Sequence, residues 1–106
     1  MNEHILLADY AHARAGDKGN ILSIAVFPLD DAHYDWLARE LTEARVAEHF
    51  AHRRPTCVRR YGAPGLKALN FVLHDALEGG VNRSPGLDRH GKSLSYLLLS
   101  MRLPRP

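Results

Sequence analysis

Side chains able to move a proton or hold an anion gather in residues 11–20, which read Ala-His-Ala-Arg-Ala-Gly-Asp-Lys-Gly-Asn. His12 and Asp17 could form an acid–base pair, because an imidazole titrates near neutral pH and a carboxylate can fix its tautomer. Arg14 and Lys18 could hold a phosphate or a carboxylate through charge-assisted hydrogen bonds. The segment therefore combines candidate catalytic residues with candidate ligand-binding residues.

Glycine and asparagine interrupt the same segment. Gly16 and Gly19 permit unusual backbone conformations and the close approach of a ligand, and Asn20 adds a polar amide, so all three join the candidate ligand-binding residues. The alternative is an ordinary turn in which Asp17 and Asn20 hydrogen-bond to their own backbone. The spacing matches neither a Walker loop nor the Gly-x-Gly-x-x-Gly dinucleotide fingerprint.

A further candidate, Asn70, lies in a leucine-rich segment. Its leucines recur at helical spacing, at Leu66, Leu69, Leu73 and Leu77. This spacing predicts a helix over residues 66–77 that places Lys67, Asn70 and His74 on one stripe, although the alternation through residues 69–73 also suits a strand. A buried amide among core residues must find protein partners or bind a ligand, and a structural amide is the alternative interpretation.

Neither the histidines nor the cysteine shows a metal or redox signature. The seven histidines are scattered along the chain, and none forms a closely spaced pair with a clear third ligand. His49 and His52 could share a helix face, but such a pair usually lies on the surface. We therefore predict no metal site. Cys57 has no partner for an internal disulfide, which fits a reducing compartment, and we expect it to be buried and inert.

Length and composition predict one domain over residues 1–106. The chain is 45% hydrophobic and 25% charged, as expected for a single core. No apolar run approaches the about 20 residues that span a bilayer, and the start lacks a basic secretory region, so we expect a cytoplasmic protein without membrane contact. A formal net charge of +2 with scattered basic residues predicts no nucleic-acid binding. The pairs Arg53-Arg54 and Arg59-Arg60 are interpreted as solvated flanks.

Apolar alternation predicts three strands. We expect them at residues 5–10, 21–27 and 56–61, and the mixed polarity of the last one places it near a sheet edge. Residues 11–20 are predicted to be the loop that joins the first two strands, since they lack large apolar side chains.

Helical spacing and turn signals predict the remaining elements. The helical spacing over residues 31–52 predicts two short helices or one kinked helix, because the apolar stripe slips near Thr42, which is a candidate N-cap. Residues 81–91 are predicted to be a loop, followed by a last helix around 94–101 that leads into a short strand through Leu103. The aromatic core residues are expected to be Tyr34, Trp36 and Phe50. An antiparallel or mixed sheet with helices packed on one face, an α+β two-layer sandwich, follows from this order.

Several short motifs, taken in order, resemble the AtuA-like domain of acyclic terpene utilisation proteins. They occupy residues 11–20, 34–37, 45–50, 60–66, 68–73 and 79–80. The resemblance implies a ferredoxin-like fold, although the predicted element order departs from a plain βαββαβ plan. It also implies a domain that occurs either fused behind a larger domain or alone, and a link to terpene catabolism through acyl-CoA intermediates. Arg83 matches the family pattern and joins the candidate ligand-binding residues.

Three functions fit these residues. The first is an accessory subunit that assembles with itself and with a larger AtuA-type partner through residues 11–20. The second is a self-sufficient small enzyme acting on an acyl-CoA or carboxylate substrate, with His12 and Asp17 as acid and base. The third is a purely structural oligomerisation module. We expect a homo-oligomer, because a short chain usually gains a deep site by pairing. No cofactor is predicted, and a CoA ester is the ligand considered.

Overall fold

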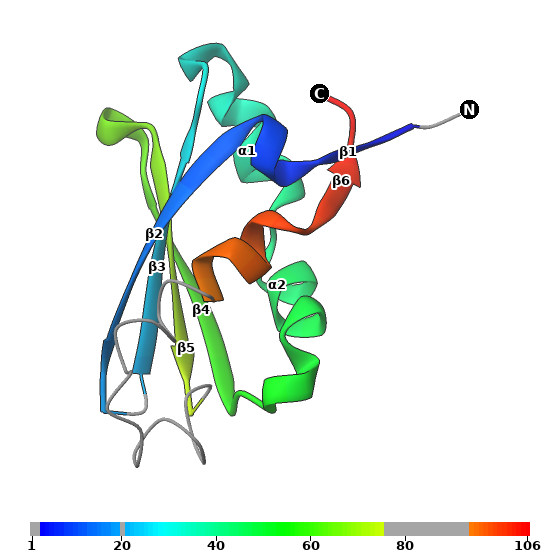
Figure 1. Ribbon diagram of the computed structural model, residues 1–106. Helices are drawn as coiled ribbons and strands as arrows, with labels where there is room; N and C mark the ends of the chain where they lie inside the picture. Colours follow the sequence, from blue (N-terminus) through cyan, green and yellow to red (C-terminus); the bar gives the residue numbers. More distant parts are fainter. Residues whose placement is uncertain (1–2, 20, 76–93) are drawn as a thin grey trace.

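The computed structural model describes residues 3–19, 21–75 and 94–106. Its centre is a four-stranded sheet in which every neighbouring pair is antiparallel (Figure 1). The strands, in their order across the sheet, are β2 (Ala11–Lys18), β3 (Ile21–Pro28), β5 (Ala68–His74) and β4 (Cys57–Ala63). A separate two-stranded sheet pairs β1 (His4–Leu6) with β6 (Arg102–Pro104).

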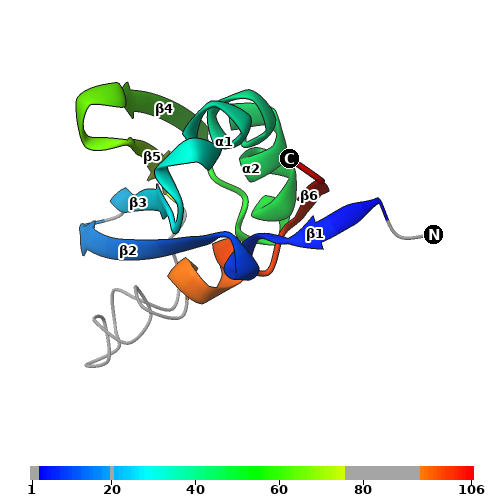
Figure 2. The ribbon, with the colours of Figure 1, turned by 90° about the horizontal axis from the view of Figure 1, so that it is seen from above.

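The helices lie on one side of the four-stranded sheet, as the view from above shows (Figure 2). They are α1 (Tyr34–Glu40), α2 (Glu43–His49) and a helix at residues 94–99. Short 3-10 turns cover Leu7–Asp9, Asp31–His33, Ala51–Arg53 and Pro64–Leu66. The predicted α+β two-layer sandwich, with helices on one face, is confirmed. Within the described residues no helix has both the length and the apolar character needed to cross a membrane.

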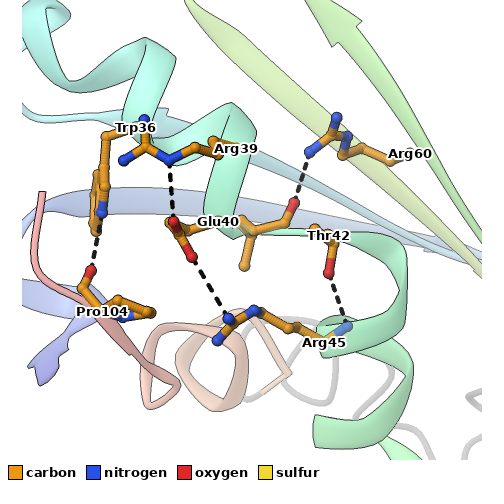
Figure 3. A network of polar contacts seen from close by, with 8 residues as sticks. Trp36, Arg39, Glu40, Thr42, Arg45, Arg60 and Pro104 are labelled. Carbon is orange, nitrogen blue, oxygen red and sulfur yellow. Dashed lines mark hydrogen bonds and ion pairs between the residues drawn. The ribbon is translucent and has the colours of Figure 1, made fainter.

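Of the two alternatives for residues 31–52, the structure has two short helices, with Thr42 at their boundary. The Thr42 hydroxyl accepts a hydrogen bond from the Arg45 backbone N–H at 3.1 Å, so Thr42 caps α2 just after α1 ends (Figure 3). A capping side chain satisfies one of the N–H groups that the first turn of a helix leaves without a partner. The slip of the apolar stripe between the two helices therefore corresponds to a true helix boundary.

One core fills the space between the sheet and the helices. Alternate residues of the two central strands point into it, namely Leu22, Ile24, Val26, Leu69, Phe71 and Leu73, each at most 1% exposed. The predicted aromatic core residues Tyr34, Trp36 and Phe50 are all buried, as expected. The Trp36 indole N–H also donates to the Pro104 carbonyl oxygen at 2.9 Å, which ties α1 to β6 (Figure 3).

The predicted loop over residues 11–20 is wrong, because most of this segment is strand β2. Ala11, Ala13 and Ala15 face the core with small side chains, and the polar residues between them face away. This is the period-two alternation of a strand, which a search for large apolar residues does not detect. Among the described residues of this segment, Gly19, at a φ of 62°, belongs to the turn. The first predicted strand is correspondingly shorter, since a 3-10 turn follows β1.

The predicted helix over residues 66–77 is also wrong, because residues 68–74 form the central strand β5. Lys67, at a φ of 51°, completes the turn after β4 and sends the chain back along it. Lys67 therefore does not share a stripe with Asn70 and His74, and its ammonium lies 5.6 Å from the centre of the Tyr34 ring. The segment is a strand because β5 is hydrogen-bonded to a neighbouring strand on each side. The local leucine spacing contains no information about this pairing.

The other predictions for the second half of the chain agree with the structure where it is described. β4 is an edge strand as expected, and it extends two residues beyond the predicted end at Tyr61. The last helix buries Leu94 and Leu98, the buried Met101 follows its end, and β6 continues through Leu103. The predicted loop over residues 81–91 lies outside the described residues.

Arg60 joins β4 to the helical layer. One guanidinium nitrogen donates to the carbonyl oxygens of Ala38, at 2.6 Å, and Leu41, at 2.8 Å, where α1 ends. These are carbonyls that a helix leaves without an internal partner. The Arg60 backbone N–H donates to the Glu43 carboxylate at 2.7 Å. The interpretation of Arg60 as a solvated flank is therefore wrong, whereas its neighbour Arg59 is exposed.

Replacing this arginine should destabilise the protein. We expect Arg60→Met to lower the free energy of unfolding by about 1–3 kcal/mol, because two half-buried carbonyls lose a charged donor. Arg59→Met, the adjacent control on the other face of β4, should change it by less than about 0.5 kcal/mol. Urea unfolding followed by circular dichroism measures both free energies. Equal effects of the two substitutions would contradict a stabilising role of the Arg60 hydrogen bonds.

Candidate functional site

The sheet face opposite the helices collects basic side chains from three strands. β2 contributes His12, Arg14 and Lys18, β4 contributes Arg59, and β5 contributes His74. We call this set of five residues the cationic sheet face. None of the described residues on these faces of the four strands is an aspartate or a glutamate. The face is therefore suited to meet a negatively charged group.

The register brings two of the predicted ligand-binding residues into one row. Arg14 lies opposite Ala25, Ala25 lies opposite Asn70, and Asn70 lies opposite Tyr61. Because neighbouring strands are about 4.8 Å apart, the backbones of Arg14 and Asn70 are separated by about 10 Å. Only the small side chain of Ala25 stands between them, so one ligand could contact both.

Asn70 has a protein partner on one side of its amide. Its Oδ1 atom accepts a hydrogen bond from the Ser23 hydroxyl at 3.3 Å, across the β3–β5 pair. Within the described part of the chain the Asn70 NH₂ group has no hydrogen-bond acceptor. The side chain is half-buried. A structural role through Ser23 and a ligand-binding role through the NH₂ group are therefore compatible.

The predicted acid–base pair of His12 and Asp17 is not formed. Successive residues of a strand point to opposite faces, so His12 lies on the cationic sheet face and Asp17 on the other side of β2. Five residues of strand also separate them, which is roughly 16 Å. His12 instead stacks on Phe27 of β3, with the ring centres 5.0 Å apart and the planes 15° from parallel.

The other predicted ligand-binding residues divide into three groups. Arg14 and Lys18 are exposed, and neither has an ion-pair partner within residues 3–19, 21–75 and 94–106. Gly16 lies between them on the same face, where an added Cβ would meet nothing within 4 Å. Gly19 forms the turn after β2. Asn20 and Arg83 lie outside the described residues.

A hollow beside β2 was not predicted from the sequence. It has a volume of about 420 Å³ and is lined by Ala13, Arg14, Ala15, Ser95 and Tyr96. We call it the β2 groove. Ser95 and Tyr96 belong to the helix at residues 94–99, far from β2 in the sequence, so no local motif could have indicated their contact with it. Tyr61 and Arg59 were also missed, and only the alternation along β4 could have placed them on the cationic sheet face.

His49, His52 and Cys57 were considered as metal or redox residues in the sequence, and their surroundings do not form such a site. The His49 Nε2 atom lies 2.8 Å from the Leu97 carbonyl oxygen and 3.1 Å from the Ser100 hydroxyl, which connects α2 to the last helix. The predicted face shared with His52 is absent, because α2 ends at His49 and His52 lies in a 3-10 turn. In the described ranges no three His, Cys, Asp or Glu side chains gather closely enough to hold a metal ion. Cys57 is half-buried at the start of β4, not fully buried as predicted.

A family model described as the AtuA ferredoxin-like domain matches residues 5–104. The chain belongs to this family. The searches of curated proteins and of solved structures found no match. Family membership and the two-layer architecture together confirm the predicted ferredoxin-like fold.

This AtuA ferredoxin-like domain varies the βαββαβ arrangement of the fold. In a plain βαββαβ chain the last strand completes the main sheet. Here β2, which precedes β3 in a hairpin, occupies that sheet edge, and β6 pairs with β1 instead. The departure from a plain plan that the sequence indicated is therefore present. Its consequence is that the polar segment with the candidate residues becomes an edge strand.

The contact between Ser23 and Asn70 should contribute little to stability. We expect a double-mutant cycle of Ser23→Ala and Asn70→Ala to give a coupling energy of at most about 1 kcal/mol, because a half-buried bond of this length is weak. Thermal unfolding of the four proteins measures it. A coupling above about 2 kcal/mol would instead assign Asn70 a mainly structural role.

Proposed function

We propose that this AtuA ferredoxin-like domain is an accessory subunit that works with a larger AtuA-type partner in acyclic terpene or branched acyl-CoA catabolism. The observation that supports this proposal is the position of β2. Its polar residues lie along an exposed sheet edge, where another protein can reach them, and the predicted proton-transfer pair is split between two faces. The resemblance to a domain found both fused and alone supports the same role.

We propose in addition that the chain forms a homo-oligomer. The chain has 106 residues and one small core, and pairing of subunits is a common way for a small domain to enclose a site. A purely structural oligomerisation module remains the simpler form of this proposal, and the capture experiment below separates the two.

Affinity capture from a native lysate at endogenous expression levels tests the accessory role. We expect the wild-type chain to recover a larger AtuA-type protein, and Arg14→Glu/Lys18→Glu to recover at least about tenfold less, since charge reversal disrupts a complementary contact. Arg54→Glu/Arg102→Glu is the control, because it makes the same change in net charge away from β2. Recovery of the homo-oligomer alone by the wild type would count against the accessory role.

The cationic sheet face supports a second function, the binding of a CoA ester. Arg14, Lys18 and Arg59 can hold phosphate groups, and no carboxylate on the described part of this face competes for them. Tyr61 is 57% exposed on the same face, and an exposed aromatic ring can stack on a nucleotide base. The hypothesis of an enzyme with His12 and Asp17 as acid and base is not supported by the geometry, because the two side chains lie on opposite faces of β2. Ligand binding does not depend on that pair.

Isothermal titration with CoA and with a branched acyl-CoA tests this second function. We expect Arg14→Ala/Lys18→Ala to raise Kd at least about tenfold, which is about 1.4 kcal/mol, and Arg54→Ala/Arg102→Ala to leave it unchanged. Affinity should also fall as salt rises, since exposed charges are screened. If the wild type binds neither compound, the CoA-ester function is excluded and the search moves to the partner protein.

A further inference from the structure

β2 is an edge strand, and among the described strands it pairs on one side only, with β3. The Leu29 N–H donates to the Tyr10 carbonyl oxygen at 2.9 Å, which makes Tyr10 and Leu29 a hydrogen-bonded pair. Such pairs alternate with non-hydrogen-bonded pairs along an antiparallel ladder. By the register of β2 and β3, Ala13 and Ala15 fall at non-hydrogen-bonded positions. Their N–H and C=O groups therefore point away from β3, toward the outer edge.

The two edges of the sheet differ in their protection. At the β4 edge, the Arg60 N–H is bonded to the Glu43 carboxylate, which blocks pairing with another chain there. At the β2 edge the outward-pointing groups belong to Ala13 and Ala15, whose small side chains cover little of the backbone. A strand edge with short side chains is a template for an added strand. The β2 edge is therefore the better place for a partner chain.

The β2 groove continues this edge toward the helical layer. It is lined by Ala13, Arg14 and Ala15 of β2 and by Ser95 and Tyr96 of the helix at residues 94–99, and Tyr96 is 71% exposed. A groove between an edge strand and a helix suits an extended peptide, whose backbone pairs with the strand while alternate side chains enter the groove. Its volume of about 420 Å³ leaves room for several side chains of moderate size.

We propose that an extended segment of a partner protein adds to this sheet as a fifth strand on β2, with acidic and apolar side chains in alternation. This inference rests on the proposed accessory role and names the chemistry of the contact. On one face of the added strand, acidic side chains would lie beside Arg14 and Lys18. On the other face, apolar side chains would enter the β2 groove beside Ala13 and Ala15, because side chains alternate along a strand.

Charge argues against a second copy of the chain as the occupant. In a two-fold antiparallel pairing centred on Gly16, Arg14 faces Lys18. In one centred on Ala15, Arg14 faces Gly16 and Lys18 faces the His12 imidazole, so neither cation meets a carboxylate. Centring on Arg14 places that residue opposite itself. Like charges directly opposite each other destabilise a strand pair. An acidic partner strand with its carboxylates on the cationic sheet face removes this repulsion.

Selection of peptides tests the proposal with a defined probe. Random twelve-residue peptides displayed on phage are selected on the wild-type chain and then measured as synthetic peptides by fluorescence anisotropy. We expect the enriched peptides to alternate acidic and apolar residues. Ala15→Pro should weaken their binding at least tenfold, because proline removes an edge donor and spares the ladder to β3. Ala15→Ser, which keeps that donor, is the matched control and should bind as the wild type does.

A second variant covers the case in which Ala15→Pro fails to fold. Selection on Arg14→Glu/Lys18→Glu should enrich peptides with basic residues in place of the acidic ones, with the same alternation. Hydrogen exchange adds an independent readout, since a bound peptide should slow exchange of the Ala13 and Ala15 amides.

Several results would overturn strand addition. In the binding experiments, these are enriched peptides without alternation and equal peptide binding by a folded Ala15→Pro variant. In the free protein, they are an Ala15 amide that is already protected from exchange in the monomer, or a dimer that Ala15→Pro dissociates. Normal capture of the larger protein from lysate by Ala15→Pro would overturn strand addition and leave the accessory role standing. Failure of the wild type to capture it would overturn the accessory role whatever the peptides show.

Discussion

The apolar side chains of β3 and β5 pack against the helices in one core, and the rest of the structure depends on this packing. Both strands are central, so hydrogen-bonded neighbours flank each of them, and β2 and β4 must take the two edges. Burial of Leu22, Ile24 and Phe71 on one face also sets which residues of every other strand face away from the helices, because register is shared across the sheet. The cationic sheet face is therefore a consequence of the core.

The two edges of the sheet have separate roles because the helical layer is attached at one of them. Arg60 and Glu43 join β4 to the helices and use an edge N–H group in doing so. At the β2 edge the helix at residues 94–99 and the small side chains of Ala13 and Ala15 line the β2 groove. One edge thus contributes to stability, and the other offers backbone, charge and space to another molecule.

A local sequence signal predicts the structure correctly where it agrees with the packing and pairing of the segment in the fold. Thr42 caps a helix in the way that its neighbours require, and the apolar alternation of residues 21–27 survives in a central strand. The prediction is wrong where the local pattern favours one structure and the tertiary contacts favour another. The leucine spacing around Asn70 fits a helix, but pairing on both sides makes the segment a strand. In β2 the residues that face the core are alanines, and an alternation of such small side chains is not recognised as the apolar pattern of a strand.

The sequence by itself determined the family, the α+β class, the helix break at Thr42 and the concentration of polar residues in the segment that became β2. These follow from residue types and short spacings, which are local properties of the chain. Only the tertiary structure decided that His12 and Asp17 lie on opposite faces, that Arg14 shares a row with Asn70, and that a helix 80 residues away lines a groove beside β2. Strand pairing fixes such relations between distant segments, and no local pattern contains the register of that pairing.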